Sequence, residues 1–314
     1  MGKFIRDILT VLLAGVILIT AVNFAYLHLN LPEKEIDKFE DMPEKIRVCN
    51  VGSSHGKNSF AYDEYEGVGC FNFGLTSQRY QYDYRLIENY IDRFEEGAVV
   101  LIPYSYFSLW GTDDEQRSDF ESMNNRYYKI LPKDKIIGYE PWVDICYHYY
   151  PVLTAYDELI DAIKDTVLGE GDNASFDEKQ IDISKDAVES LQSQIVSNRD
   201  AEGNSILNEE RLEALEAMIE LCKNKGLRPV LITTPLTKTL TDLVKEKEPD
   251  FLEYFYGFAD DLCEKYDLEY YDYSCDERLY DNYDLFIDSH HLNKEGAKLF
   301  TRIVMEEVAR PGEI

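Results

Sequence analysis

The chain has 314 residues, of which 45% are hydrophobic and 30% are charged. These values predict one large folded domain, or one domain with an insertion, and exclude a disordered chain. The formal net charge of −29 argues against nucleic acid as a partner, because a protein that binds phosphate backbones needs a basic face. It also disfavours a surface that lies flat on anionic lipid.

The N-terminal segment is apolar enough to cross a membrane. Residues 8–26 read ILTVLLAGVILITAVNFAY without a charge and follow Lys3 and Arg6, a run long enough to span a bilayer as a helix. The basic residues before it and the acidic residues after it place the N-terminus in the cytoplasm and the rest of the chain outside. A cleaved signal peptide is the alternative, but no clear A-x-A site follows. We therefore expect an uncleaved signal anchor over residues 1–30 and a charged tether over residues 31–45.

The first predicted strand ends in a turn that contains serine. Residues 47–59 read RVCNVGSSHGKNS, in which a β-branched run stops at Gly52 and turns through Ser53 and Ser54. A serine at this place lies at the carboxyl edge of a sheet, where open α/β folds bind ligands and where backbone N–H groups stabilise negative charge. Ser54 is therefore a candidate nucleophile. The alternative is that Ser53 and Ser54 only cap the next helix.

Two further strands follow, with a helix between them. GVGCFNFG at residues 67–74 predicts a strand that ends at a glycine, and AVVLIP at residues 98–103 predicts a strand buried on both faces. Between them, apolar residues recur at helical spacing from Ser77 to Phe94, which predicts a covering helix capped by Ser77.

The alternation of strand and helix stops between Gly111 and Ile206. Polar and acidic runs there surround a tyrosine-rich patch, YHYYPVLTAY. We interpret residues 111–206 as a mainly helical or irregular insertion after the third strand. Substrate-contacting lids are often built this way and so are inert surface excursions, so both interpretations stay open.

Strands and helices alternate again from Asn208 onward. An N-cap and an acidic first turn begin a helix that stops at Gly226, and residues 230–233 form a fourth, buried strand. A further helical pattern precedes a fifth strand in LEYYDYS, and Asn293 caps a terminal helix. This alternation implies right-handed crossovers and a parallel sheet covered on both faces, so the predicted fold class is α/β.

A second polar motif lies near the C-terminus. The sequence FIDSHHLNKEGAKLF places Asp288 and His291 three residues apart. A serine hydroxyl is a weak nucleophile until a base takes its proton, and that base needs a third group to fix its tautomer. Ser54, His291 and Asp288 therefore form a candidate catalytic triad for acyl transfer through an acyl-serine. On this reasoning alone, His290 can face the serine as well as His291 can.

The two motifs resemble those of the SGNH (GDSL-like) hydrolase and acyltransferase superfamily, whose first block is Gly-Asp-Ser and whose last is Asp-x-x-His before a terminal helix. Gly52-Ser53-Ser54 matches the first block, with Ser53 where the family usually has Asp, and residues 288–291 match the last. Gly-Ser-Ser behind a membrane segment is most similar to the envelope branch that includes the teichoic-acid D-alanylation protein DltD and the alginate O-acetylation proteins. The resemblance implies a three-layer, flavodoxin-like parallel sheet of strand order 2-1-3-4-5 within residues 46–314.

The resemblance also implies roles for single residues. His291 is the base because the family spacing from Asp288 reaches it, and Asp288 orients its ring. Gly74 takes the place of the family glycine whose backbone N–H binds the oxyanion, and Asn72 lies two residues before it.

The third block of the family is missing. Members commonly carry Gly-x-Asn-Asp after the third strand, with the Asn side chain as a second oxyanion donor, whereas this chain reads YSYFSLWG. Ser105, Tyr104 or Tyr106 replaces that donor, or the backbone amides of Ser54 and Gly74 form the oxyanion hole alone. Loss of one donor can slow acyl transfer by a factor of about a hundred or more. His55 either contacts substrate or is an exposed turn residue, and we favour the exposed residue.

The cysteines do not indicate a metal site. There are six, at Cys49, Cys70, Cys146, Cys222, Cys263 and Cys275. They show no C-x-x-C pair and no histidine at ligand spacing, so neither zinc nor another cofactor is expected. Cys49 and Cys70 fall on neighbouring predicted strands, so a disulfide is conceivable in an exported domain, but buried free thiols are favoured.

Two functions are compatible with these motifs. The first is a membrane-anchored, extracytoplasmic serine esterase or O-acyltransferase that acts on an acylated envelope polysaccharide, glycan or related polymer. The second is a non-catalytic accessory or assembly partner of a multi-spanning membrane O-acyltransferase. Intact Ser54, Asp288 and His291 favour the first function, and the missing third block favours the second.

Overall fold

The computed structural model describes residues 2–28, 35–112, 120–153 and 182–310. The chain divides into two compact units, one of residues 1–39 with 124–175 and one of residues 40–123 with 176–314. Within the predicted insertion, the described residues form short helices and irregular segments. Residues 113–119 and 154–181 of the insertion lie outside the described part.

The first unit contains a long apolar helix, α1 (Gly2–Leu27). This helix is long and apolar enough to cross a membrane, and most of its large apolar side chains are exposed. Its one buried amide, Asn23, donates from Nδ2 to the Tyr149 carbonyl oxygen (3.0 Å) and accepts at Oδ1 from the Val152 amide (3.3 Å). The polar residue near the end of the apolar run is therefore satisfied by the backbone of the insertion.

The other helices in the described part of this unit are short. They are α5 (Pro141–Tyr149), η5 (Arg126–Lys129), η6 (Lys133–Lys135) and η7 (Pro151–Leu153). A further helix, α4 (Phe120–Asn125), and a 3-10 turn, η1 (Asp37–Asp41), lie where the chain passes between the units.

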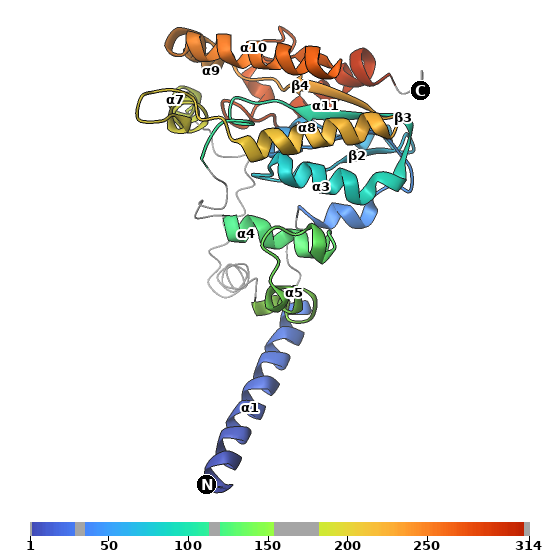
Figure 1. Ribbon diagram of the computed structural model, residues 1–314, viewed down its shortest axis with the longest axis vertical. Helices are drawn as coiled ribbons and strands as arrows, with labels where there is room; N and C mark the ends of the chain where they lie inside the picture. Colours follow the sequence, from blue (N-terminus) through green and yellow to red (C-terminus); the bar gives the residue numbers. More distant parts are fainter. Residues whose placement is uncertain (1, 29–34, 113–119, 154–181, 311–314) are drawn as a thin grey trace. The chain divides into compact units, whose positions relative to one another are not determined.

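The second unit is built on a five-stranded parallel sheet (Figure 1). Its strands are β1 (Ile46–Asn50), β2 (Cys70–Asn72), β3 (Phe94–Pro103), β4 (Arg228–Thr233) and β5 (Glu269–Asp272). Their order is β2-β1-β3-β4-β5, and every pair is parallel. The predicted α/β class and strand order 2-1-3-4-5 are confirmed.

Helices connect the strands. They are α2 (Ser54–Ser59), α3 (Tyr80–Tyr90), α7 (Ile183–Gln194), α8 (Glu209–Asn224), α9 (Lys238–Lys247), α10 (Pro249–Tyr266) and α11 (Lys294–Val304). Single turns lie at η2 (Asp63–Tyr65), η3 (Ile91–Arg93), η9 (Val196–Asn198), η10 (Tyr283–Leu285) and a π-helical η11 (Met305–Ala309). Asn208 and Asn293 cap α8 and α11 through their side chains, as predicted.

The predicted cap at Ser77 is wrong. Helix α3 begins at Tyr80 with Arg79 at the N-cap position, and Ser77 lies in the turn before it with a φ of 56°. An N-cap residue needs extended backbone, whereas this positive φ is left-handed. The local sequence favoured a cap, and the turn that leads out of β2 determined the conformation instead.

Alternating residues of the central strands pack on opposite sides of the sheet. Val48, Val99 and Val230 join a buried cluster with Phe300 and Val304 of α11. Their neighbours along the strands point the other way by the same alternation, to the face along which α3 and α8 lie side by side (Figure 1). Burial on both faces explains why β3 and β4 read as continuous apolar runs.

All six cysteines are free thiols. Cys49 is buried on β1, and Cys70 on β2 pairs with Val48 rather than with Cys49. The favoured expectation of unpaired thiols agrees with this arrangement.

We expect Gly56→Ala to lower the free energy of unfolding by about 3 kcal/mol, because a Cβ there would lie 2.0 Å from the Val51 carbonyl oxygen. Gly257→Ala is the matched control on α10, where nothing lies within 4 Å of the added Cβ. That change should stabilise by about 0.5–1 kcal/mol, because alanine loses less backbone entropy in a helix. Denaturant unfolding of the detergent-solubilised chain measures both, and equal midpoints for the two variants would contradict the packing argument.

Candidate active site

Ser54 is the first residue of α2, directly after the turn that ends β1. Gly52 makes this turn with a φ of 104°. Ser53 is the N-cap, and its Oγ accepts from the His55 amide (3.4 Å). The capping interpretation therefore holds for Ser53, and the side chain of Ser54 is left for another partner.

A buried carboxyl group holds the turn from below. Asp83 Oδ1 accepts from the Gly52 amide (2.7 Å) and from Gln78 Nε2 (2.6 Å). Burial raises the pKa of Asp83 to about 7, against these two hydrogen bonds and the charge of Arg79, which lower it. Near neutral pH the turn is thus held by a group that is close to its own titration point.

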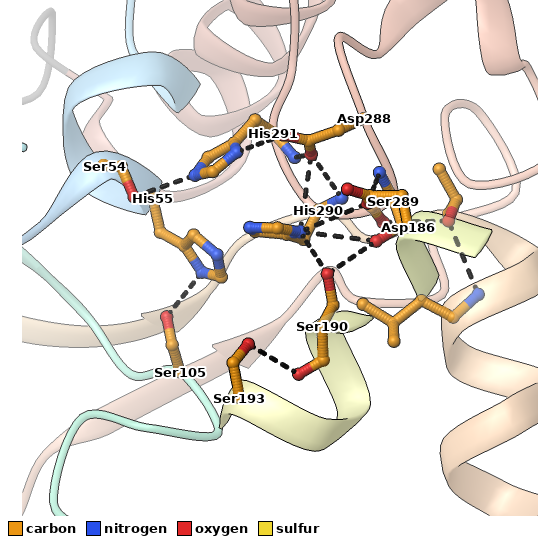
Figure 2. A network of polar contacts seen from close by, with 12 residues as sticks. Ser54, His55, Ser105, Asp186, Ser190, Ser193, Asp288, Ser289, His290 and His291 are labelled. Carbon is orange, nitrogen blue, oxygen red and sulfur yellow. Dashed lines mark hydrogen bonds and ion pairs between the residues drawn. The ribbon is translucent and has the colours of Figure 1, made fainter. Parts of the chain in front are cut away.

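The partner of Ser54 is His291 (Figure 2). His291 Nε2 lies 2.8 Å from Ser54 Oγ, and its Nδ1 lies 2.7 Å from Asp288 Oδ2. Asp288 Oδ1 accepts from the backbone amides of His290 (2.9 Å) and His291 (2.8 Å). The three residues predicted as a triad therefore form one continuous chain of hydrogen bonds, within the reach that proton transfer requires.

Electrostatics keep Asp288 ionised. Burial alone raises the pKa of this carboxyl, but the hydrogen bond from His291 and the electrostatic interactions with the His290 and His291 rings hold the pKa well below its usual range. An ionised Asp288 accepts from His291 Nδ1–H. This fixes the tautomer in which Nε2 carries the lone pair that faces Ser54.

The neighbouring His290 faces a different set of groups. Its Nδ1 lies 3.0 Å from Ser190 Oγ and 3.3 Å from Ser289 Oγ. Burial, followed by the charge of His291, lowers the pKa of His290 to about 4, so the ring is neutral at ordinary pH. Of the two adjacent histidines, His291 is the one that reaches the serine.

Helix α7 fixes the loop that carries these histidines. Asp186 Oδ2 accepts from the Ser289 amide (2.8 Å), and Ser190 Oγ lies 3.1 Å from Ser289 Oγ (Figure 2). The sequence analysis missed Asp186 and Ser190, because both belong to a polar helix at the end of the insertion and stand in no motif. Their only signal was the position of α7 directly before strand–helix alternation resumes.

His55 is not an exposed turn residue, and that expectation is wrong. Its side chain is 2% exposed, and Nδ1 lies 2.8 Å from Ser105 Oγ. The ring packs edge-on against Phe107 at 5.0 Å. Burial, then the charges of His290 and His291, lower the pKa of His55 well below its usual value. The next residue, Gly56, packs so closely that an added Cβ would lie 2.0 Å from the Val51 carbonyl oxygen, so this part of α2 is also in tight contact with the segment after β1.

Gly74 and Asn72 lie where β2 meets α2. The Gly74 amide donates to Asn72 Oδ1 (2.9 Å), and Asn72 Nδ2 donates to the carbonyl oxygens of Lys57 (3.0 Å) and Phe60 (2.9 Å). A Cβ at Gly74 would lie 2.5 Å from the Lys57 amide nitrogen, so the close approach of the two segments needs glycine. In this structure both residues hold α2 against the sheet.

The other residues considered as oxyanion donors are engaged elsewhere. The Tyr104 hydroxyl donates to the Phe255 carbonyl oxygen (3.1 Å), and Tyr106 packs edge-on against the Phe255 ring at 5.1 Å. Ser105 Oγ contacts His55, as described above, and the Ser105 amide donates to Ser108 Oγ (2.8 Å). Ser105 thus holds the buried ring of His55.

A cavity of about 200 Å³ opens beside Ser54. Its described lining includes Ser53, His290 and residues of α7, with Phe107 and Arg79 on the side of β3 and α3. A largely polar cavity at the nucleophile suits a substrate that carries hydroxyl groups.

No protein-family model matches the chain, and no curated protein matches it. Among solved structures, the chain is similar to a protein from Bacteroides fragilis NCTC 9343 that is named a putative acylhydrolase, with a TM-score of 0.42 and 11% sequence identity. The match covers 88% of this chain and 95% of that chain. Similarity of this extent does not bear on function, which rests on the geometry of the site.

Replacing Asp83 with Asn should change how stability depends on pH. The folded pKa of about 7 is above the unfolded value, so the stabilisation from the protonated carboxyl is complete below about pH 4 and is lost as the pH rises through 7. Across that window, the free energy of unfolding of wild type should fall by up to about 1.4 kcal/mol per pH unit relative to that of Asp83→Asn. The side-chain oxygen introduced in this variant still accepts from the Gly52 amide. Urea unfolding between pH 4.5 and 8.5 measures this difference.

Asp92→Asn, at an exposed position on η3, serves as the control. The free energy of unfolding of this variant should change with pH in parallel with that of wild type over the same range. An Asp83→Asn curve that is also parallel to wild type would contradict the burial of an ionisable group under the turn.

Proposed function

We propose that the protein is a membrane-anchored serine esterase or O-acyltransferase that works through an acyl-serine. The continuous hydrogen-bonded chain from Ser54 through His291 to Asp288 is the observation that carries the proposal. It stands at the carboxyl edge of a parallel sheet of order β2-β1-β3-β4-β5, where open α/β folds bind ligands. The resemblance to the SGNH superfamily in the first and last motifs supports the same reading.

The geometry supports a two-step reaction. In the first step, Ser54 Oγ attacks the carbonyl carbon of an ester while His291 Nε2 takes its proton, and the leaving oxygen then receives that proton as its bond to carbon breaks. In the second, water or an acceptor hydroxyl attacks the acyl-serine, His291 takes its proton, and Ser54 is released with the proton returned. Asp288 stays ionised and stabilises the imidazolium.

The backbone amides of Ser54 and Gly74 are the oxyanion donors in this proposal. The Gly74 amide then exchanges its bond to Asn72 for one to the oxyanion. That exchange gives up one hydrogen bond, so we expect transition-state stabilisation below that of a site with a third, uncommitted donor.

For the substrate, we propose an acylated polysaccharide or related polymer of the cell envelope. Helix α1 would cross the membrane with its N-terminus in the cytoplasm and hold the site outside, close to polymers at the membrane surface. A tether of this kind raises the effective concentration of such substrates and favours even a slow reaction. The polar cavity beside Ser54 supports a hydroxyl-rich substrate.

A second function is favoured by a specific observation. The Gly74 amide and the Ser105 hydroxyl are both engaged within the protein, and the family's third block is absent. A non-catalytic partner of a multi-spanning membrane O-acyltransferase would keep the fold and the anchor without an efficient oxyanion hole.

A fluorophosphonate probe distinguishes the two functions, because it reacts only with an activated serine. We expect the detergent-solubilised wild type to be labelled, Ser54→Ala to remain unlabelled, and Ser53→Ala to retain labelling as the matched control. Asp288→Asn should slow hydrolysis of a nitrophenyl ester by about 10⁴-fold, because the ring of His291 loses its tautomer partner. A wild type that is never labelled would reject the enzyme and leave the accessory function.

Membrane attachment has its own test. Full-length protein should stay in the membrane pellet after an alkaline carbonate wash, whereas a variant that begins at residue 31 without α1 should be released. Protease added to intact cells should reach the second unit if the proposed orientation is correct. Protection of that unit in intact cells and its cleavage only after lysis would reverse the orientation.

A further inference from the structure

Three imidazole rings meet beside the nucleophile (Figure 2). The ring centroids of His55 lie 5.3 Å from those of His290 and His291, and the latter two are 4.0 Å apart. One ring nitrogen from each histidine lies within 4.8 Å of the other two. The acyl-transfer mechanism uses only His291, so the other two rings have no assigned chemistry.

Each ring is held from outside by an oxygen atom at Nδ1. Ser105 Oγ lies 2.8 Å from this atom in His55, Ser190 Oγ lies 3.0 Å from it in His290, and Asp288 Oδ2 lies 2.7 Å from it in His291. Metal-bound histidines are generally fixed in this way, because the outer hydrogen bond sets the tautomer and directs the other nitrogen to the ion. With Nδ1 of each ring held in this way, Nε2 is the nitrogen left to face a ligand in His55 and His290, and in His291 it faces Ser54 Oγ.

His55 Nε2 is the atom that calls for a ligand. It is fully buried, and it has no hydrogen-bond partner in the part of the chain that the structure describes. Buried ring nitrogens are rarely left without a partner, because the loss of solvation is not repaid. Figure 2 shows the free side of the His290 ring turned toward His55.

We propose that His55, His290 and His291 bind a zinc-like transition-metal ion through Nε2, and that the bound ion blocks the serine. Neutral imidazoles suit Zn²⁺, and three of them leave a fourth position for water. Tetrahedral Zn–N bonds of about 2.1 Å require nitrogens about 3.4 Å apart, so nitrogens that lie within 4.8 Å of one another must close by at most about 1.4 Å. The blocking half of the proposal rests on the proposed function.

Metal binding and catalysis compete for a single atom. His291 Nε2 is the nitrogen that faces Ser54 Oγ, so an ion on that nitrogen removes the base for the serine. Asp288 remains on Nδ1 in both states and becomes the outer partner of a metal ligand. The same side chains thus serve either an active form without metal or an inactive form with metal.

A neighbouring group of Asp186, Asp288 and His290 also has ligand atoms within 4.8 Å of one another. Its carboxylate oxygens already accept from the backbone amides of Ser289, His290 and His291. None of its side chains has a buried nitrogen without a partner, so the three imidazoles are the better site.

The test uses full-length protein in detergent after removal of metals with a chelator. Calorimetric titration with ZnCl₂ should show one site, and CoCl₂ should give the intense visible absorption of tetrahedral cobalt. We expect His55→Gln and His290→Gln each to weaken binding by about a hundredfold or more. His148→Gln, an exposed histidine on α5, and Cys275→Ser, a partly buried thiol, are the controls and should bind as wild type does.

Blocking is read from the ratio of fluorophosphonate labelling rates with and without ZnCl₂, taken for each variant separately. The ratio should fall at least tenfold in wild type and stay near one in His55→Gln. Zinc binding that is unaffected by either histidine change, or lost in Cys275→Ser, would overturn the site. A third outcome separates the two proposals. If His55→Gln loses zinc binding but the wild type is never labelled by the probe, the metal site is supported and the proposed enzyme is rejected.

Discussion

The contact between Ser54 and His291 joins residues that are 237 positions apart, and it depends on where the parallel strands end. The turn after β1 and the segment that follows β5 both leave the carboxyl edge of the same sheet. Every strand pair runs in the same direction, so both segments lie at the same edge of the sheet, and the loop after β5 must span the positions of β4 and β3 to reach the turn. Gly56 and Gly74 position the serine end of this contact, because they let α2 pack closely on Val51 and on the segment after β2. Helix α7 holds the histidine end through Asp186 and Ser190.

This edge gathers an unusual amount of buried polarity. Three imidazoles and the carboxyl of Asp288 lie together, and Nδ1 of each ring has an oxygen partner, whereas His55 Nε2 is fully buried without one among the described residues. A half-satisfied polar network costs stability, because a buried group that has lost water gains nothing in return. Among the three imidazoles that cost falls on His55 Nε2, and a function at the site is a direct reason to retain it.

Much of the sheet could be predicted from the sequence because its signals are local. The apolar runs of β3 and β4, the cap at Asn208 and the glycine that ends β1 depend on neighbouring residues, and their elements formed as expected. The spacing of Asp288 and His291 is local too, so their pairing with Ser54 could be proposed from the sequence. The choice between His290 and His291 needed the family spacing, since nothing in the local sequence distinguishes two adjacent rings.

The errors arose where distant segments decide the outcome. His55 is expected at the surface because it follows a turn, but Ser105 and Phe107, about 50 residues further along the chain, bury its ring. Serine is a favoured residue type at a helix N-cap, so the local sequence predicts Ser77 at that position. The turn after β2 instead gives Ser77 a left-handed backbone conformation. Asp186 and Ser190 support the site because α7 packs against the loop that carries the histidines. A contact between segments about 100 residues apart cannot be predicted from a local sequence pattern.

On the proposed membrane anchoring, the hydrogen bonds of Asn23 limit the length of α1 that lies in lipid. With Asn23 tied to the backbone of Tyr149 and Val152, the uncharged part of α1 before it runs only from Ile8 to Val22. Fifteen residues of helix measure about 22 Å, less than the roughly 30 Å of a hydrocarbon layer. On the anchored topology, the exposed rings of Trp142 and Tyr149 then fall at headgroup depth, where amphipathic aromatics are favoured. The segment after Pro141 would thereby lie at the membrane surface and limit the depth to which α1 inserts.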